Sequence, residues 1–392
     1  MASLRKQLSS SGFKSSRTTN LHYPRHSSLP PGAITDFVWK DYSPLLFRNI
    51  QDLGDVNYED YMLSVCNHET LMALALRGSC GKPFYLAHDD RFVIKLLRKS
   101  EAKVLLEMLP SYYNHIKRHD NSLLAKYYGL HASRPGTGGA KVYFVVMENL
   151  LRTELQMHRL YDLKGSSQGR NATRNGNQQR LTLKDLEFDL CFYLNPSHRS
   201  QILEQIKIDC KYLEEQGIMD YSLLLGIHVD RPQRDSSKGR SHDDSAQAEN
   251  GTDHPRAEIV EAFHRRDPTF SQFIPSNRLD VTRFGAKVQA RAMRMHQIDR
   301  ESPSESLKST SQGSNNVYLF LGIIDFLQNY NMLKRLEHAY KSLHYNPKTI
   351  SPVNPRLYAM RFQDFLCKVF LVDESISPES DGLILQDASM IS

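Results

Sequence analysis

Three ionisable residues in separate segments of the chain could act together on a phosphate group. Lys95 lies inside the apolar run 92–97, Asp220 lies between a helical pattern and an apolar run, and Asp325 directly follows an apolar run. Burying a charged group costs free energy unless it has a partner of opposite charge. The three together form a minimal set for phosphoryl transfer, in which the lysine neutralises phosphate, one aspartate orients the attacking hydroxyl and the other holds a metal ion.

Each of these residues also has an ordinary structural explanation. Lys95 would point to water if its strand lay at the edge of a sheet. Asp220 would serve as a cap or turn residue at the end of its helix, and Asp325 would be solvated where its strand ends. Residue type alone leaves both explanations open at all three positions.

A glycine-containing turn shortly before Lys95 favours the chemical explanation. Glycines can adopt positive φ, which lets backbone N–H groups converge on phosphate oxygens. Such a turn followed by a strand lysine predicts that Lys95 contacts the phosphates of ATP, whose usual metal partner is Mg²⁺, here at Asp325. Glu101 is a candidate ion-pair partner for Lys95. The expected phosphate-binding residues of the turn are Gly78, Ser79, Gly81 and Lys82.

Apolar patterns predict the elements that position Lys95. The runs 82–86 and 91–97 are typical of a β-hairpin. Residues 101–117 carry apolar side chains at helical spacing, with Ser100 as the expected N-cap. The continuous apolar run 142–147 predicts a buried strand.

Similar patterns surround the two aspartates. Residues 202–213 repeat apolar side chains on one helical face, and Gly217 can end that helix in the left-handed conformation. The runs 223–229 and 317–324 predict two buried strands. A hairpin, a helix and a strand therefore precede a helix-rich half that contains further strands, which indicates two lobes.

Composition divides the chain into a folded unit and polar segments. Of 392 residues, 40% are hydrophobic and 24% charged, which excludes a wholly disordered or fibrous protein. Residues 1–35 hold five basic and no acidic residues, and we expect a disordered basic arm. The catalytic unit would span 36–370, interrupted by a polar insertion at 231–316 and followed by an acidic flexible tail at 371–392.

Other classes of protein are disfavoured. The five cysteines include no CxxC pair, which argues against a disulfide framework or a zinc site and suits a reducing cytosol. The longest apolar run, 317–324, is too short to span a bilayer, and we find no apolar signal-peptide core. The net charge of +6 could attract anionic membrane or simply be solvated, and no aromatic–basic motif predicts binding to nucleic acid.

Four motifs in order along the chain resemble those of the phosphatidylinositol phosphate kinases. They are YDLKGS at 161–166, MDYSLL at 219–224, GIID at 322–325 and YAMRF at 358–362. The match is collinear from residue 39 to residue 370. The stretch 334–343 looks most like plant-type phosphatidylinositol 4-phosphate 5-kinases, here in a short form that lacks N-terminal repeats.

The resemblance implies a fold and roles for single residues. The fold would be α+β and two-lobed, distantly protein-kinase-like, with an antiparallel sheet in an N-lobe at 36–147 and a mixed C-lobe at 148–370. Lys95 matches the lysine that contacts ATP, Asp220 the catalytic aspartate, and Asp325 the metal-binding aspartate. Met147 falls where the hinge meets adenine, and Lys164 is similar to a lysine near the transferred phosphate.

The resemblance also implies an activity and a membrane partner. A kinase of this type would transfer the γ-phosphate of ATP to the 5-hydroxyl of phosphatidylinositol 4-phosphate. Glu337 matches an acid that distinguishes these enzymes from the 5-phosphate 4-kinases. Basic residues near an anionic leaflet contribute about 1 kcal/mol each. Those in the same segment that would dock on the cytoplasmic face of the plasma membrane are Lys334, Arg335 and Lys341.

Two alternatives stay open. One is a catalytically weak scaffold of the same fold that binds phosphoinositides, and the other is a 5-phosphate 4-kinase. The resemblance is also compatible with a homodimer.

Overall fold

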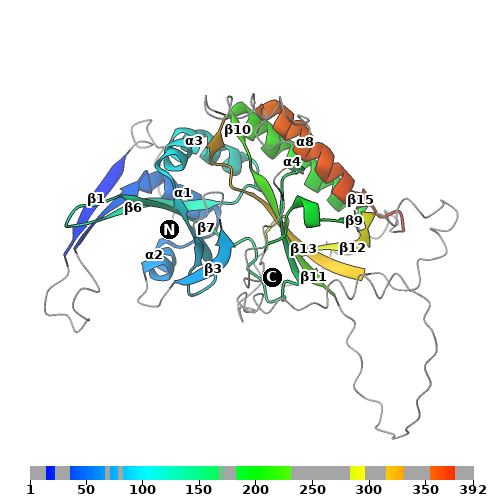
Figure 1. The fold of residues 1–392 in the computed structure, drawn as a ribbon, viewed down its shortest axis with the longest axis horizontal. Coiled ribbons are helices and arrows are strands. Elements are labelled where there is room, and N and C mark those ends of the chain that lie inside the picture. The colour runs from blue at the N-terminus through cyan, green and yellow to red at the C-terminus, as the bar shows by residue number, and fades with distance from the viewer. Residues whose placement is uncertain are drawn as a thin grey trace, which may run out of the picture.

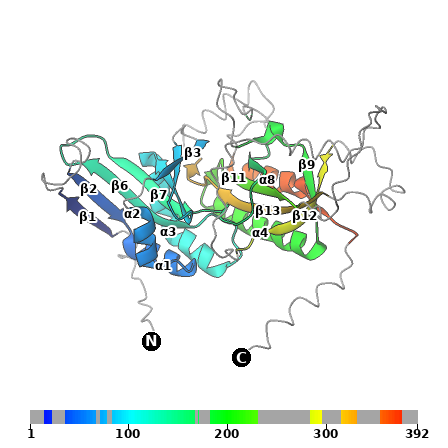
Figure 2. The ribbon, with the colours of Figure 1, turned by 90° about the horizontal axis from the view of Figure 1, so that it is seen from below.

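The computed structural model describes residues 15–22, 36–66, 71–77, 83–166, 170, 182–230, 283–295, 315–330 and 354–375. Two large sheets, each with its own helices, form two lobes that follow one another along the long axis of the molecule (Figures 1 and 2). This α+β, two-lobed architecture is the one expected from the motifs. In the described part of the chain, no helix is long and apolar enough to cross a membrane.

The N-lobe is built on a seven-stranded antiparallel sheet in the order β1-β2-β6-β7-β5-β4-β3. Its strands are β1 Ser16–Leu21, β2 Phe37–Tyr42, β3 Met72–Arg77, β4 Pro83–Leu86, β5 Phe92–Leu97, β6 Tyr127–Pro135 and β7 Val142–Glu148. The predicted hairpin is confirmed as β4 and β5, and the predicted buried strand is β7. β5 lies in the interior of the sheet, between β4 and β7, so Lys95 is not on an edge strand.

Three helices belong to the N-lobe, namely α1 Pro44–Leu53, α2 Tyr58–Cys66 and α3 Lys99–Arg118. Helix α3 buries Leu105, Leu109, Tyr112 and Ile116, whose spacing of three and four places them on one face. The expected N-cap at Ser100 is wrong, because the helix begins earlier. Its N-cap is Arg98, whose backbone N–H donates to the Glu101 carboxylate at 2.7 Å.

The C-lobe holds a six-stranded mixed sheet in the order β15-β9-β12-β13-β11-β8, in which only the β15–β9 pair is parallel among the described strands. The strands are β8 Arg159–Leu163, β9 Leu190–Leu194, β11 Ser222–Val229, β12 Val288–Arg294, β13 Asn315–Ile324 and β15 Phe370–Val372. Helices α4 Pro196–Glu215 and α8 Pro355–Val369 pack side by side on this lobe (Figure 1). The short helix η2 Asp185–Glu187 precedes β9, and β10 Ile218–Met219 pairs with β14 Gln328–Asn329.

Three segments predicted to be polar contain residues of strands in the structure. Residues 16–21 of the arm form β1, an edge strand whose side chains are mostly exposed and therefore show no apolar pattern. Residues 288–294 of the insertion form β12, which buries only the small side chains of Ala290 and Ala292. Residues 371 and 372 of the predicted tail complete β15, and the Asp373 carboxylate pairs with Arg291.

A buried carboxylate ties helix α3 of the N-lobe to helix α4 of the C-lobe. Asp209 on α4 has no exposed surface. Its oxygens lie 2.7 Å from the His115 Nε2 on α3 and accept the Ser122 hydroxyl at 2.8 Å. They also accept the Gln205 amide at 3.0 Å and the Leu123 backbone N–H at 2.8 Å. Because this group fixes Leu123, it also fixes the segment that enters β6.

That segment hydrogen-bonds to the strand that leads to Asp325. The backbone N–H of Ile323 donates to the Leu123 oxygen at 2.6 Å, and the N–H of Ala125 donates to the Ile323 oxygen at 2.9 Å. The end of β13 is therefore held by the chain segment that follows α3 and is hydrogen-bonded to Asp209 of α4. Asp325, two residues beyond Ile323, takes its position from both lobes.

Candidate active site

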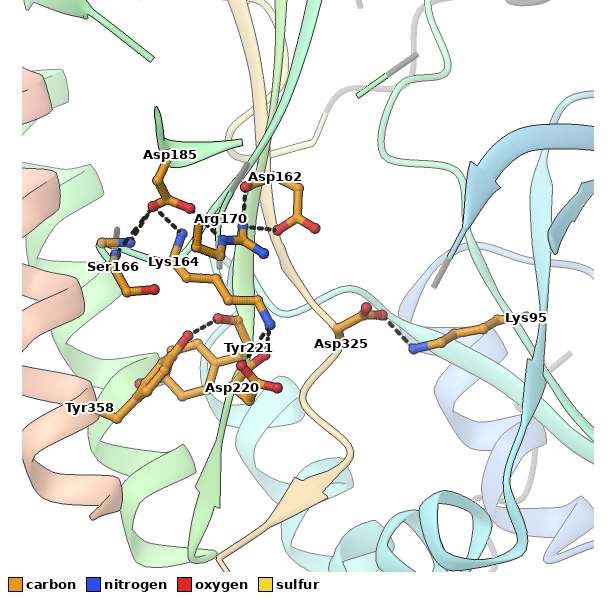
Figure 3. Close-up of polar contacts among 11 residues, drawn as sticks. Lys95, Asp162, Lys164, Ser166, Arg170, Asp185, Asp220, Tyr221, Asp325 and Tyr358 are labelled. Atoms are coloured by element: carbon orange, nitrogen blue, oxygen red, sulfur yellow. Dashed lines mark hydrogen bonds and ion pairs between the residues drawn. The ribbon is translucent and has the colours of Figure 1, made fainter. Parts of the chain in front are cut away.

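Lys95 and Asp325 meet where the two lobes face each other. The Nζ of Lys95, on β5, lies 2.5 Å from Asp325 Oδ1, and the two side chains are 4% and 13% exposed. Figure 3 shows them reaching toward each other from opposite lobes. The Glu101 carboxylate, the expected partner of Lys95, accepts the Arg98 backbone N–H at the start of α3, whereas Lys95 forms its ion pair with Asp325. Two residues predicted to act together are therefore in direct contact.

Asp220 forms a second ion pair, with Lys164. The Nζ of Lys164 donates to Asp220 Oδ1 at 2.7 Å and to the Asp220 backbone oxygen, also at 2.7 Å. Lys164 directly follows β8, and Asp220 precedes β11, which pairs with β8. Both side chains are largely buried, at 9% and 22% exposure. The ammonium group is thus held by two oxygens of the residue expected to be catalytic.

The strand register places both aspartates at the same end of the C-lobe sheet. β11 and β13 are antiparallel neighbours in which Ser222 pairs with Ile324. Asp220 lies just before the start of β11 and Asp325 just after the end of β13, so the two carboxylates leave the sheet together. Figure 3 shows the two ion pairs on this shared side. The three residues singled out by sequence are therefore brought into one region.

The two aspartates also share an uncommon backbone conformation. Their φ angles are 67° at Asp220 and 63° at Asp325, in the left-handed region. Aspartate and asparagine tolerate this region better than other non-glycine residues, and such positions cluster at functional sites. The hydrophobic pattern of the neighbouring strands carries no signal for this conformation.

A cluster of charged side chains that sequence reasoning missed surrounds Lys164. Arg170 Nε lies 2.6 Å from the Asp185 carboxylate, and its Nη2 lies 3.1 Å from the Asp162 carboxylate. Burial alone would raise the pKa of Asp162, but the positive charges of Arg170 and Lys164 hold it below the usual value. Arg170 and Asp185 come from polar segments without periodicity, so only the tertiary structure reveals them.

Helix α8 contacts the site through an aromatic hydroxyl. The buried Tyr358 donates its hydroxyl to the backbone oxygen of Tyr221, and the two rings pack edge to face with centroids 4.7 Å apart. Burial raises the pKa of Tyr358 well above its usual value, which keeps the phenol protonated as a donor. The Arg361 guanidinium stacks 5.0 Å from the Tyr358 ring, and burial lowers the pKa of Arg361.

The remaining predicted residues are placed in part. Met147 lies near the end of β7 and is 6% exposed, and it faces Val93 across the β5–β7 pair. The turn between β3 and β4 and the segment before α8 lie outside the described residues. Gly78, Ser79, Gly81, Lys82, Lys334, Arg335, Glu337 and Lys341 belong to these two segments.

The donor set suits a metal ion that arrives with a nucleotide. Within the described ranges, no group of three or more histidine, cysteine, aspartate or glutamate side chains could form a complete metal cage. Mg²⁺ is usually held by one or two carboxylates together with substrate phosphates and water. Asp325 offers a partly exposed carboxylate beside a lysine, which fits this mode of binding.

Comparison with known proteins identifies a family for this chain. The profile of the family described as Phosphatidylinositol-4-phosphate 5-Kinase matches residues 65–369. Phosphatidylinositol 4-phosphate 5-kinase 10 of Arabidopsis thaliana is 39% identical over 422 residues, covering 93% of this chain and 98% of that protein. Two longer relatives are matched over about half their length.

One is phosphatidylinositol 4-phosphate 5-kinase 3 of Arabidopsis thaliana, 39% identical over 383 residues, which cover 95% of this chain and 51% of the relative. The other is phosphatidylinositol 4-phosphate 5-kinase 1 of Oryza sativa subsp. japonica, 37% identical over 412 residues, which cover 93% and 51%. The resemblance expected from the four motifs is thereby confirmed, and the chain belongs to the phosphatidylinositol-4-phosphate 5-kinase family.

Proposed function

We propose that this protein is an ATP-dependent lipid kinase that transfers the γ-phosphate of ATP to the 5-hydroxyl of phosphatidylinositol 4-phosphate. The observation that carries the proposal is the arrangement of the Lys95–Asp325 and Lys164–Asp220 pairs at one end of the C-lobe sheet. The product would be phosphatidylinositol 4,5-bisphosphate. The names of the relatives support this choice of lipid.

Asp220 is the residue we assign to the attacking hydroxyl. Its Oδ1 is bound by Lys164, so we assign Oδ2 to accept the hydrogen bond, and then the proton, of the inositol 5-hydroxyl. Lys164 holds the carboxylate in place and adds a positive charge beside the reacting phosphoryl group. Phosphoryl transfer needs positioning and charge stabilisation more than covalent chemistry from the protein.

Lys95 and Asp325 form the nucleotide side of the site. In the structure each neutralises the other, which removes the cost of burying two isolated charges. A nucleotide phosphate would give Lys95 an anionic partner, and Asp325 would hold Mg²⁺. The ion, when bound, neutralises charge on the phosphates. We place adenine near Met147 and the phosphates near Gly78, Ser79, Gly81 and Lys82.

Contacts to the lipid and the membrane complete the proposal. Glu337 would favour the 5-hydroxyl, and three basic residues of the same segment would contact an anionic leaflet on the cytoplasmic face of the plasma membrane. These are Lys334, Arg335 and Lys341. A homodimer is compatible with this arrangement.

The test is a kinase assay of the purified full chain with MgATP and vesicles that carry each monophosphorylated phosphatidylinositol in turn. We expect the fastest turnover with the 4-phosphate lipid and a 4,5-bisphosphate product. Preferred turnover of the 5-phosphate lipid would establish a 4-kinase instead. Vesicle binding without any turnover would establish a non-catalytic scaffold.

A further inference from the structure

Asp185 directs its two carboxylate oxygens to two different parts of the site. Oδ1 accepts the backbone N–H groups of Lys164 at 2.9 Å, Gly165 at 2.7 Å and Ser166 at 3.4 Å. Oδ2 accepts Arg170 Nε at 2.6 Å. The side chain is only 7% exposed, and it lies beside the Lys164 backbone in Figure 3.

The bonds to Oδ1 set the shape of the turn that carries Lys164. Three successive N–H groups converge on one oxygen, an arrangement that suits a negative charge. Gly165 has a φ of 67°, and an added Cβ would lie 2.8 Å from Phe365 Cβ, so this turn is closely packed as well as left-handed. The direction of the Lys164 side chain toward Asp220 depends on this turn.

The bond to Oδ2 acts on the beginning of the same turn. Arg170 also donates to the backbone oxygen and the carboxylate of Asp162, the residue two positions before Lys164. Asp185 therefore contacts the turn directly, through the backbone amides of residues 164–166, and indirectly, through Arg170 and Asp162. Both routes end at the ammonium group that contacts the Asp220 carboxylate.

We propose that Asp185 is a positioning residue for phosphoryl transfer, which holds Lys164 against Asp220 without touching substrate itself. The inference rests on the proposed function for its kinetic consequence. Its structural consequence, protection of the three amides at 164–166, does not depend on that function. The two consequences are measured separately.

The experiment compares Asp185→Ala, which removes both oxygens, with Asp185→Asn. Asparagine keeps an acceptor for the three amides but sets its NH₂ group against the Arg170 donor. Asp189→Asn is the matched control, because Asp189 lies on the same segment and its side chain is 50% exposed. Hydrogen–deuterium exchange of the segment 160–166 and steady-state kinetics with MgATP and phosphatidylinositol 4-phosphate vesicles are measured for each full-length variant.

For Asp185→Ala we expect faster exchange at 164–166 and a kcat lower by about 10-fold, a smaller loss than the upper limit of about 100-fold for a displaced reacting group, because Lys164 itself remains. KM for ATP should change little, because Lys95 and Asp325 belong to the other ion pair. Asp185→Asn should keep most of the amide protection and fall between wild type and Asp185→Ala in kcat. The control should match wild type in both measurements.

Unchanged exchange at 164–166, or wild-type kcat, in Asp185→Ala would overturn the inference. If that variant fails to fold, Asp185→Asn decides: a kcat equal to wild type would overturn the role of the Arg170 contact. The two variants could instead show the same loss of kcat and the same loss of melting temperature as each other, together with a raised KM for ATP. That result would indicate a general structural role for Asp185 and would overturn the inference. If wild type itself does not turn over the lipid, the proposed function fails while the exchange data still test Asp185.

Discussion

The two lysine–aspartate pairs of the site differ in what holds them together. Lys95 and Asp325 come from different lobes, so their contact depends on how the lobes sit relative to each other. Lys164 and Asp220 flank two strands that pair within one sheet, β8 and β11, so their contact is set by strand register. In the proposed mechanism, the first pair would respond to a nucleotide between the lobes. The second pair would hold the acceptor hydroxyl at a fixed position.

The comparison predicts that loss of Asp220 removes chemistry but leaves nucleotide binding intact. Asp220→Asn should lower kcat by about 10²- to 10⁴-fold, the usual range for a positioned acid–base group. Asparagine tolerates the left-handed backbone at this position, so strain is not the cause. The rise in melting temperature on addition of MgATP should persist.

Asp230→Asn is the control for this variant, since Asp230 is an exposed aspartate just beyond the other end of β11. Retained lipid phosphorylation in Asp220→Asn would refute the catalytic assignment.

Breaking the pair between the lobes should remove both turnover and the response to nucleotide. In wild type, MgATP at 100 times its Kd should stabilise the fold by about 2.7 kcal/mol. Lys95→Met should abolish this stabilisation, and it should also lower the free energy of unfolding, because Asp325 would be left with an uncompensated buried charge. The measurement is thermal unfolding with and without MgATP.

The double variant Lys95→Met with Asp325→Asn sharpens this test. It should unfold at a higher temperature than Lys95→Met alone, since neither charge remains, while staying inactive. A full MgATP shift in Lys95→Met would contradict the placement of the nucleotide.

Removal of the Lys164 ammonium group should have a smaller effect on kcat. A hydrogen bond to a charged group contributes about 1.5–3 kcal/mol, so Lys164→Gln should lower kcat by roughly 10- to 100-fold. The MgATP-induced rise in melting temperature should match wild type. Lys207→Gln, at a lysine with a 67% exposed side chain, is the control. A loss of the MgATP shift in Lys164→Gln would show that the two pairs are not independent.

The smallest effect on turnover is expected at the buried carboxylate that ties α3 to α4. Asp209→Ala leaves several buried donors without an acceptor and should lower the free energy of unfolding by about 3–5 kcal/mol. Turnover of the folded fraction should fall modestly, with a raised KM for ATP, because Leu123 and the end of β13 would lose a support. Denaturant unfolding measures the first effect, and Glu204→Gln on the same helix is the control. Wild-type stability would contradict the role given to Asp209.

Sequence patterns predicted the interior of both lobes better than their margins. Buried strands such as β5, β11 and β13 are runs of apolar residues. A charged residue within or next to such a run is a clear sequence signal, and Lys95, Asp220 and Asp325 all carry it. β1 pairs with β2 through backbone hydrogen bonds, and its side chains are mostly exposed. Its sequence is therefore typical of a polar arm and not of a buried strand.

The supporting charges of the site had no such signal. Asp185 acts through contacts to amides about twenty positions away in sequence, and Arg170 joins two carboxylates that belong to different elements. Periodicity reports burial of a face, whereas these contacts depend on how a turn and a short helix meet in space. The left-handed backbone of the two aspartates had no sequence signal either, because both residues lie just outside strands, where the hydrophobic pattern has ended.

Helix α8 contacts the chain beside both members of the Lys164–Asp220 pair. Near its start, Tyr358 hydrogen-bonds the backbone beside Asp220, and about two turns later Phe365 packs against Gly165 of the Lys164 turn. Because both contacts come from one helix, a shift of the α8 axis would move the segments that carry Lys164 and Asp220 together. A displacement of α8 would therefore change the geometry of the Lys164–Asp220 pair without any contact to either side chain.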